Sequence, residues 1–297
     1  MNQMERILID CVCRNDFAQA KKIAKDILQR IHTQSDERFK ERNLQLLGES
    51  EALKVPYNLQ HILVVEDVRD YPEERFLLRE NEKHLIEKMK NAYAAAAWLE
   101  EKGLKYLPSL LLYGKSGCGK TELAKYIAYK MGLPFVYVRF SSLVESLLGK
   151  TQSNLSLIFE FVKTVPCVLC FDEIDAIGMQ RGDQNDVSEM SRVVIAMMQE
   201  IDRLPNRVVL VGTTNRHDRL DAALARRFIT SHEIKPLCRE ESIALSGKVF
   251  AAAGIQGKKY ETWAQEAFGE NVAASEVINR SVEKIVEVFM AEQEGKD

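Results

Sequence analysis

A glycine-rich stretch at residues 114–121 has the residue types and the spacing of a phosphate-binding loop. It reads GKSGCGKT, which is a glycine, any four residues, and then glycine, lysine and threonine. The glycines let backbone amides approach phosphate oxygens, and a helix that begins here adds the positive end of its dipole. Lys120 is expected to reach the β- and γ-phosphates of ATP, and the Thr121 hydroxyl to ligate Mg²⁺. The residues that we assign to nucleotide binding are Gly114, Lys115, Ser116, Gly117, Cys118, Gly119, Lys120, Thr121 and Glu122.

Two adjacent acids, Asp172 and Glu173, follow a later apolar segment, VLCF at 168–171. Asp172 is expected to hold Mg²⁺ directly or through water, and Glu173 to orient and polarise the attacking water as a general base. Acids at this place are also typical of a helix N-terminus, where the dipole favours them. Their position after a phosphate-binding loop favours the catalytic interpretation.

A further polar residue, Asn215, comes just beyond the apolar run VVLVG at 208–212. Ligands of parallel sheets bind outside the carboxyl ends of the strands, so Asn215 is a candidate to hold the attacking water or to sense the γ-phosphate. Taken alone, an asparagine that forms a turn is the better explanation. Together with the two motifs above, the sensor role is favoured.

The adjacent residues Arg226 and Arg227 have two explanations that the sequence leaves open. They lie near a predicted helix end, where cations interact favourably with the dipole. Arginines at such a place also act as fingers that stabilise charge on the γ-phosphate in the transition state.

Alternating apolar and amphipathic segments must position these residues. Strands separated by helices of ten or more residues predict an α/β fold with a doubly wound parallel sheet of the P-loop type. The strands are predicted at 109–113, 135–139, 167–171 and 208–213, and the helices at 121–131, 151–163 and 187–202.

Four regions are predicted along the chain. Residues 1–48 form an N-terminal helical bundle, because apolar residues recur there at helical spacing (Phe17, Ala20, Ala24, Ile27, Leu28 and Ile31). Residues 49–75 lose this periodicity and are interpreted mainly as a linker, with a short strand at 64–65. Residues 76–236, which open with a long helix at 79–101, are the α/β core. Residues 237–297 are acidic and helical and form a C-terminal lid, with its last helix beginning at Ala274.

Composition limits the classes of function that are open. The chain has 297 residues, 46% of them hydrophobic and 29% charged, with a net charge of -3, which argues against disorder and gives no global electrostatic case for nucleic acid. A local basic patch is left open. No apolar run approaches the roughly 18 residues that span a bilayer, and the first residues lack a signal-peptide pattern, so we expect a cytoplasmic protein without a membrane partner. Cys167 and Cys170 form a CxxC, but on a strand they point to opposite faces and are expected to be core residues.

These motifs resemble the AAA family of ATPases, nearest its spastin- and katanin-like clade and related bacterial ATPases. The resemblance covers about residues 75–290 and is carried by GKSGCGKT (114–121), CFDEIDAIG (170–178), GTTNR (212–216) and LDAALARRF (220–228), in the family's order and spacing. It implies a ring, usually a hexamer, in which Arg226 and Arg227 act on ATP bound by the neighbouring subunit.

The resemblance also assigns a pore loop and a role for the N-terminal bundle. Leu147, Leu148 and Gly149 match the loop that grips a threaded polypeptide, with Leu147 at the position that is normally aromatic. The N-terminal bundle resembles domains that recruit a substrate or partner, although its apolar stripe is equally explained by its own core. The family's sensor arginine has no counterpart near Ala274, Ser275 and Glu276, and Arg280 is not assigned that role.

The function implied is hydrolysis of Mg-ATP to remodel, unfold or disassemble a protein partner. Two alternatives stay open at this point: a DNA-linked AAA loader, and a scaffold that changes partners on binding nucleotide.

Overall fold

The structure is a computed structural model that describes residues 3–13, 20, 23–24, 26–28, 30, 40, 55–73, 76–139, 151–175, 184–255 and 258–294. The chain divides into two compact units, Met1–Lys54 and Val55–Asp297. In the first unit, helix α1 spans Gln3–Cys13, and Cys11, Ala20 and Leu28 are buried. The full three-helix bundle predicted for residues 1–48 lies largely outside the described residues and stays a prediction.

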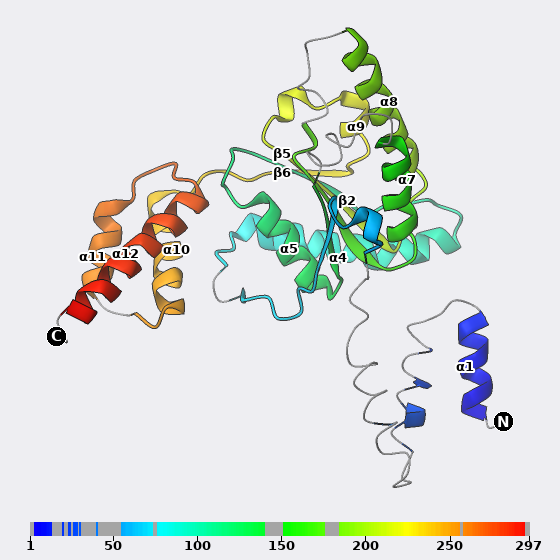
Figure 1. Ribbon diagram of the computed structural model, residues 1–297, viewed down its shortest axis with the longest axis horizontal. Helices are drawn as coiled ribbons and strands as arrows, with labels where there is room; N and C mark the ends of the chain where they lie inside the picture. The colour runs from blue at the N-terminus through cyan, green and yellow to red at the C-terminus, as the bar shows by residue number, and fades with distance from the viewer. Residues whose placement is uncertain are drawn as a thin grey trace. The chain divides into compact units, whose positions relative to one another are not determined.

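The second unit contains a six-stranded sheet, which confirms the predicted α/β fold class (Figure 1). Its order is β1-β3-β4-β5-β2-β6; β1 and β3 are antiparallel, and every other neighbouring pair is parallel. The bounds are β1 Leu63–Glu66, β2 Ser109–Tyr113, β3 Phe135–Arg139, β4 Cys167–Asp172, β5 Val208–Thr214 and β6 Thr230–Glu233. The four strands predicted between 109 and 213 are present within a residue of their predicted ends.

The segment before the core differs from its interpretation as a linker. The compact unit begins at Val55, and strand β1, which contains the short strand predicted at 64–65, pairs with β3 from Leu63↔Val138 to Glu66↔Phe135. The 3-10 helix η1 (Tyr57–Leu59) precedes it, and Leu59 and Ile62 are completely or almost completely buried. Residues 55–73 therefore belong to the sheet unit, because apolar side chains and strand pairing fix them to it.

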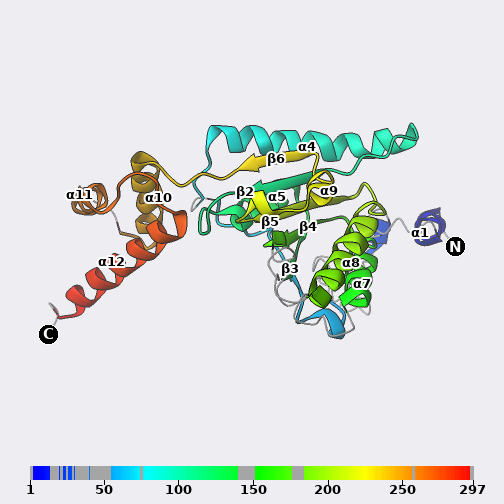
Figure 2. The same cartoon turned by 90° about the horizontal axis from the view of Figure 1, so that it is seen from above.

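Helices cover both faces of the sheet. Helices α4 (Glu80–Glu101) and α5 (Lys120–Met131) pack on one face, where they share a core with Leu110, Leu112 and Cys170, and α4 runs along the sheet in Figure 2. On the opposite face, Phe159 of α7 (Thr151–Val162) stacks on Phe171 of β4 with ring centroids 5.7 Å apart. Successive residues of a strand face opposite sides, which explains why Cys170 and Phe171 enter different layers. Helix α8 (Gln184–Ile201), the 3-10 helix η4 (His217–Arg219) and the short helix α9 (Ala222–Ala225) complete this region.

Three helices occupy the region predicted as a C-terminal lid, called the lid below (yellow-orange to red in Figure 1): α10 Arg239–Ala252, α11 Lys258–Ala267 and α12 Ala274–Glu294. They have a core of their own, made by Leu237, Leu245, Ala264, Phe268 and Val277. A hydrogen bond of 2.8 Å between the buried hydroxyls of Ser246 and Ser281 joins α10 to α12. The last helix begins at Ala274, as the sequence predicts.

The cysteines of β4 confirm their assignment to the core. Cys167 and Cys170 are free and fully buried, and burial raises the pKa of the Cys167 thiol to about 12. Thiols that stay protonated are poor nucleophiles and poor metal ligands. Within the described parts of the chain, no helix is both long and apolar enough to cross a membrane.

Candidate nucleotide-binding site

The predicted phosphate-binding loop connects the buried strand β2 to helix α5, as the motif requires. Gly114 and Gly117 have φ values of 144° and 76°. A Cβ atom on Gly114 would lie 2.1 Å from the carbonyl oxygen of Ile234, and one on Gly117 would lie 2.2 Å from the Ser275 hydroxyl oxygen. Both positions therefore require glycine for two reasons: their backbone torsions are unfavourable for other residues, and Ile234 and Ser275 leave no room for a Cβ atom.

Lys120, the first residue of α5, is held inside the loop. Its Nζ donates hydrogen bonds to the carbonyl oxygens of Gly114 (3.0 Å) and Lys115 (2.9 Å) and to Oδ1 of Asn215 (2.7 Å). The side chain is only 7% exposed, and burial lowers the pKa of Lys120. An ammonium group in this position gains stabilisation from an added anion, because the nearby carbonyls carry only partial charges.

The two predicted magnesium ligands lie side by side at the carboxyl end of β4. Thr121 Oγ1 donates to Asp172 Oδ1 at 3.0 Å, and the Thr213 hydroxyl donates to the same oxygen. The Tyr137 hydroxyl donates to Asp172 Oδ2 at 2.8 Å, which together with burial raises the pKa of Tyr137. A carboxylate and a hydroxyl are the oxygen donors that Mg²⁺ prefers, and one or two such protein ligands beside a phosphate are the usual arrangement. The residues present therefore fit Mg²⁺.

Glu173 follows Asp172 with its backbone in the left-handed region, at φ 53°. Its amide donates to Thr213 Oγ1 at 3.1 Å, and its Oε1 accepts from Nδ2 of Asn215 at 3.4 Å. A non-glycine residue in this region is strained, and such residues cluster at functional sites. The turn directs the Glu173 side chain toward Asn215, so the structure brings together the predicted base and the predicted sensor.

One end of a cavity of about 500 Å³, a size typical of small-molecule sites, is lined by the polar residues Lys120, Thr121, Asp172, Glu173 and Asn215. The other end, where the core meets the lid, is mainly apolar and is lined by Tyr71, Pro72, Phe76, Leu77, Ile234, Leu237, Leu245 and Ile278. Of the residues assigned to nucleotide binding, Ser116 to Glu122 line the cavity. Gly114 and Lys115 do not, and contribute carbonyl oxygens to Lys120 instead. Glu122 is tied to the apolar end, because it accepts a hydrogen bond from the Tyr71 hydroxyl at 2.7 Å.

Sequence reasoning missed the apolar end of the cavity and two of the hydroxyls on Asp172. Tyr137 is the middle residue of β3 and Thr213 is the penultimate residue of β5, and both strands are neighbours of β4 in the sheet. A polar side chain within an apolar strand is a signal, but only the order of the strands shows that both hydroxyls reach the same carboxylate.

The two arginines lie away from this cavity, and neither lines it. Arg227 donates to both carboxylate oxygens of Asp202, at 3.3 and 3.1 Å, and to the carbonyl oxygen of Ala223 at 2.9 Å. Arg226 is exposed, and within the described ranges its side chain has no hydrogen bond or ion pair. Arg227 thus has the helix-end contact that one explanation expects, and Arg226 is the freer of the two.

The pore-loop residues Leu147, Leu148 and Gly149 lie outside the described residues. Arg280 pairs with Glu276 at 3.6 Å and covers the ring of Phe268, and it does not line the cavity.

A glycine-rich loop between strand and helix, a lysine within it, and a threonine–aspartate pair beside a strained glutamate define a P-loop ATPase. The class is then refined by comparison, since residues 110–236 match the family model described as "ATPase family associated with various cellular activities (AAA)". This segment is thus similar to AAA family ATPase domains, which confirms the expected enzyme class at the level of the domain.

Known relatives match less than half of the chain. The uncharacterised AAA family ATPase y4kL of Sinorhizobium fredii is 40% identical over 130 residues, which are 44% of this chain and 39% of that protein. The peroxisomal ATPase pex6 of Schizosaccharomyces pombe is 38% identical over 134 residues, which are 43% of this chain and 14% of that protein. The peroxisomal ATPase PEX6 of Saccharomyces cerevisiae is 37% identical over 129 residues, which are 42% of this chain and 12% of that protein. The chain thus spans less than half the length of these relatives.

Proposed function

We propose that this chain hydrolyses Mg-ATP in a ring oligomer, most simply a hexamer, and uses the energy to remodel, unfold or disassemble a protein partner. The observation that carries the hydrolytic part is the convergence of Lys120, the Thr121–Asp172 pair and the Asn215–Glu173 pair on one cavity. The AAA domain and its kinship to y4kL and the PEX6 proteins support the remodelling part.

Each side chain has a role in this proposal. The apolar end of the cavity takes the nucleoside, and the loop amides with Lys120 take the phosphates. Thr121 and Asp172 hold Mg²⁺, which supplies positive charge against the phosphate oxygens when bound. Glu173 accepts the proton of the attacking water, and Asn215 holds that water and the Glu173 carboxylate in line.

The ring is proposed because of the two arginines. Arg226 is exposed and does not line its own cavity, which supports a role for it on nucleotide held by a neighbouring copy, with Arg227 as its support. The N-terminal unit would recruit the partner, and residues 147–149 would grip it. Placement nearest the spastin- and katanin-like clade and a cytoplasmic location belong to this proposal as well.

A second function, a scaffold that changes partners on binding nucleotide, is favoured by one feature. Leu147 stands where the pore loop of the family normally has an aromatic residue, which weakens the argument for threading.

The proposal is tested by measuring ATP hydrolysis per subunit against protein concentration with Mg²⁺. We expect a steep rise with concentration, because complete sites form between subunits. Lys120→Ala should bind no nucleotide. Glu173→Gln should bind ATP but hydrolyse it more slowly than the wild type by a factor of at least about 100. Binding without hydrolysis at every concentration would support the scaffold. Normal turnover by Glu173→Gln would refute the assignment of the base.

A further inference from the structure

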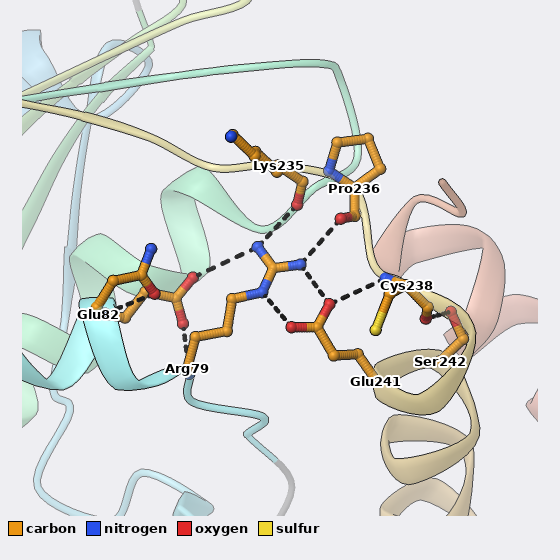
Figure 3. A network of polar contacts seen from close by, with 8 residues as sticks. Arg79, Glu82, Lys235, Pro236, Cys238, Glu241 and Ser242 are labelled. Carbon is orange, nitrogen blue, oxygen red and sulfur yellow. Dashed lines mark hydrogen bonds and ion pairs between the residues drawn. The ribbon is translucent and has the colours of Figure 1, made fainter. Parts of the chain in front are cut away.

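The guanidinium group of Arg79 donates four hydrogen bonds to three residues, Glu241, Lys235 and Pro236 (Figure 3). Nε and Nη2 donate to Oε1 and Oε2 of Glu241, each at 2.8 Å. Nη1 donates to the carbonyl oxygen of Lys235, and Nη2 also to that of Pro236, each at 2.9 Å. Two parallel charge-assisted bonds to one carboxylate are the strong, directional form of an arginine ion pair.

These four bonds connect different parts of the molecule. Arg79 is the residue before helix α4, which packs on the sheet, whereas Glu241 is in the first turn of α10, which belongs to the lid. Lys235 and Pro236 lie on the short connection from β6 to the lid. One side chain therefore ties the core, the connection and the lid together, as Figure 3 shows.

The local electrostatics support a fixed geometry. The Arg79 side chain is 16% exposed, and its backbone amide donates to Oε2 of Glu82 at 2.9 Å. Glu82 is buried, and that burial raises the pKa of its carboxyl group. The hydrogen bonds from Arg79 lower the pKa of Glu241, which keeps this carboxylate ionised at neutral pH.

Two residues of this network also line the proposed nucleotide cavity. Arg79 and Glu82 line it from the core side, and Leu245 and Ile278 line it from the lid. A second tie lies at the phosphate end, where the amide of Ser275 in α12 donates to the carbonyl oxygen of Gly117 at 2.9 Å. These hydrogen bonds thus attach the lid to the core beside Arg79 and at the glycine-rich loop.

We propose that Arg79 is a positioning residue that holds the apolar wall of the lid over the cavity through Glu241, and so couples nucleotide binding to the orientation of the lid. This rests on the proposed function of the cavity as a nucleotide site. Coupling of this kind is reciprocal, so bound nucleotide also strengthens the Arg79–Glu241 pair. Lysine does not replace arginine here, because it lacks the planar fork that spans both carboxylate oxygens.

The test is a double-mutant cycle on the full chain, with the dissociation constant of the fluorescent analogue mant-ATP as readout, in the presence of Mg²⁺. Arg79→Met and Glu241→Gln should each raise this constant about tenfold, and the double variant should raise it by about the same factor, since the pair is already broken. Lys284→Met is the matched control, because it breaks an ion pair of 2.6 Å with Glu287 elsewhere on the lid. It should leave the constant unchanged.

Two further readouts separate positioning from general damage. In steady-state hydrolysis the KM for ATP should rise in Arg79→Met and Glu241→Gln, while kcat stays within about twofold. Mg-ADP should slow hydrogen exchange of the segment 235–241 in the wild type, and the effect should be lost in Arg79→Met. If Arg79→Met unfolds, Glu241→Gln keeps the size of the side chain and carries the test.

The outcomes that overturn the proposal are distinct from those that overturn the nucleotide site. Unchanged affinity in both single variants, or a double variant weakened by about 100-fold through two independent effects, rejects the coupling through this pair. Wild-type protein that fails to bind mant-ATP at all rejects the nucleotide site itself, and the coupling with it.

Discussion

Asn215 accepts a hydrogen bond of 2.7 Å from the ammonium group of Lys120. Because this bond occupies the amide oxygen, the NH₂ end of Asn215 is turned toward Glu173, where it donates at 3.4 Å. The amide thus connects the phosphate-binding lysine to the predicted base. We therefore expect a phosphate that attracts Lys120 to change the contacts of Asn215 and, through Asn215, the position of Glu173.

Replacing Asn215 with alanine should therefore lower kcat by about 100-fold, because the base and its water lose their orientation. The KM for ATP should change little, since Lys120 keeps its bonds to the loop carbonyls. Steady-state ATPase kinetics measure both. Asn206→Ala is the control, because Asn206 Nδ2 donates to Ala96 O at 3.2 Å and does not line the cavity. A large rise in KM with kcat unchanged would show that Asn215 serves binding and not hydrolysis.

Loss of the Tyr137 hydroxyl group should weaken the binding of Mg²⁺. Tyr137→Phe removes the donor to Asp172 Oδ2, whereas Thr121 and Thr213 remain on Oδ1. Outer partners of metal ligands typically contribute 10- to 100-fold to metal affinity, so the Mg²⁺ concentration for half-maximal hydrolysis should rise about tenfold. A titration of ATPase activity with Mg²⁺ at saturating ATP measures this.

The matched control for Tyr137 is Tyr126→Phe. The Tyr126 hydroxyl donates a hydrogen bond to Glu73 at 2.7 Å. Tyr126→Phe therefore removes one partly buried tyrosine–carboxylate hydrogen bond and leaves the contacts of Asp172 intact. Its Mg²⁺ requirement should equal that of the wild type. An unchanged requirement in Tyr137→Phe would mean that the two threonines alone orient the carboxylate.

The sequence predicted the parts of this site that depend on local patterns. Residues 114–121 and Asp172 follow short apolar runs that form buried strands, so both the strand and the polar residues after it are visible in one segment. Strand β6, with the polar sequence TSHE, was missed, because it is an edge strand that forms through pairing with β2 and not through its own pattern. Such pairing is a tertiary effect that outweighs local propensity.

The prediction of a linker at residues 49–75 was wrong from Val55 onward for the same reason. Two prolines and a loss of periodicity are real turn signals, yet the pairing of β1 with β3 fixes residues 63–66 to the sheet. Tyr71 and Phe76 then reach the cavity beside Leu245 and Ile278, which come from the lid at the far end of the sequence. No single window of sequence contains both sides of that wall.

The geometry separates the roles of the two adjacent arginines. Arg227 is engaged by Asp202 and by the carbonyl of Ala223, whereas Arg226 is exposed. Arg226→Ala should lower kcat by about 1000-fold without loss of stability, if it acts as a finger on the neighbouring subunit. Arg227→Ala should lower the melting temperature as well, because the end of α9 loses its ties.

Mixing of subunits tests whether Arg226 acts in trans. Arg226→Ala and Lys120→Ala subunits should each be inactive, but a mixed ring would contain interfaces where an intact cavity faces an intact arginine. ATPase activity should therefore reappear on mixing and depend on the ratio of the two. The absence of activity at every ratio would count against the trans role.

The hydrogen bonds of Glu73 give a prediction for stability as a function of pH. Glu73 Oε1 accepts from Tyr126 and from Lys130, at 2.7 and 2.5 Å, and Oε2 accepts from Tyr129 at 3.0 Å. These bonds, that from Lys130 foremost, lower the pKa of Glu73 from its ordinary 4.5 to about 2. Between these two values the unfolded chain binds more protons than the folded one, so the stabilisation is complete above pH 4.5 and is lost as the pH falls toward 2.

Glu73→Gln should accordingly be less stable than the wild type near neutral pH, and the difference in unfolding free energy should shrink as the pH falls below about 4.5. Urea unfolding at a series of pH values measures this difference. Glu87→Gln is the control, because Glu87 has one exposed ion pair, with Lys90 at 3.0 Å, and exposed pairs contribute little. A difference for Glu73→Gln that stays constant with pH would mean that the three donors stabilise the protonated carboxyl group of Glu73 as well as they do the carboxylate. The charge of Glu73 would then have no part in holding Tyr126 and Tyr129 behind the aromatic wall of the cavity.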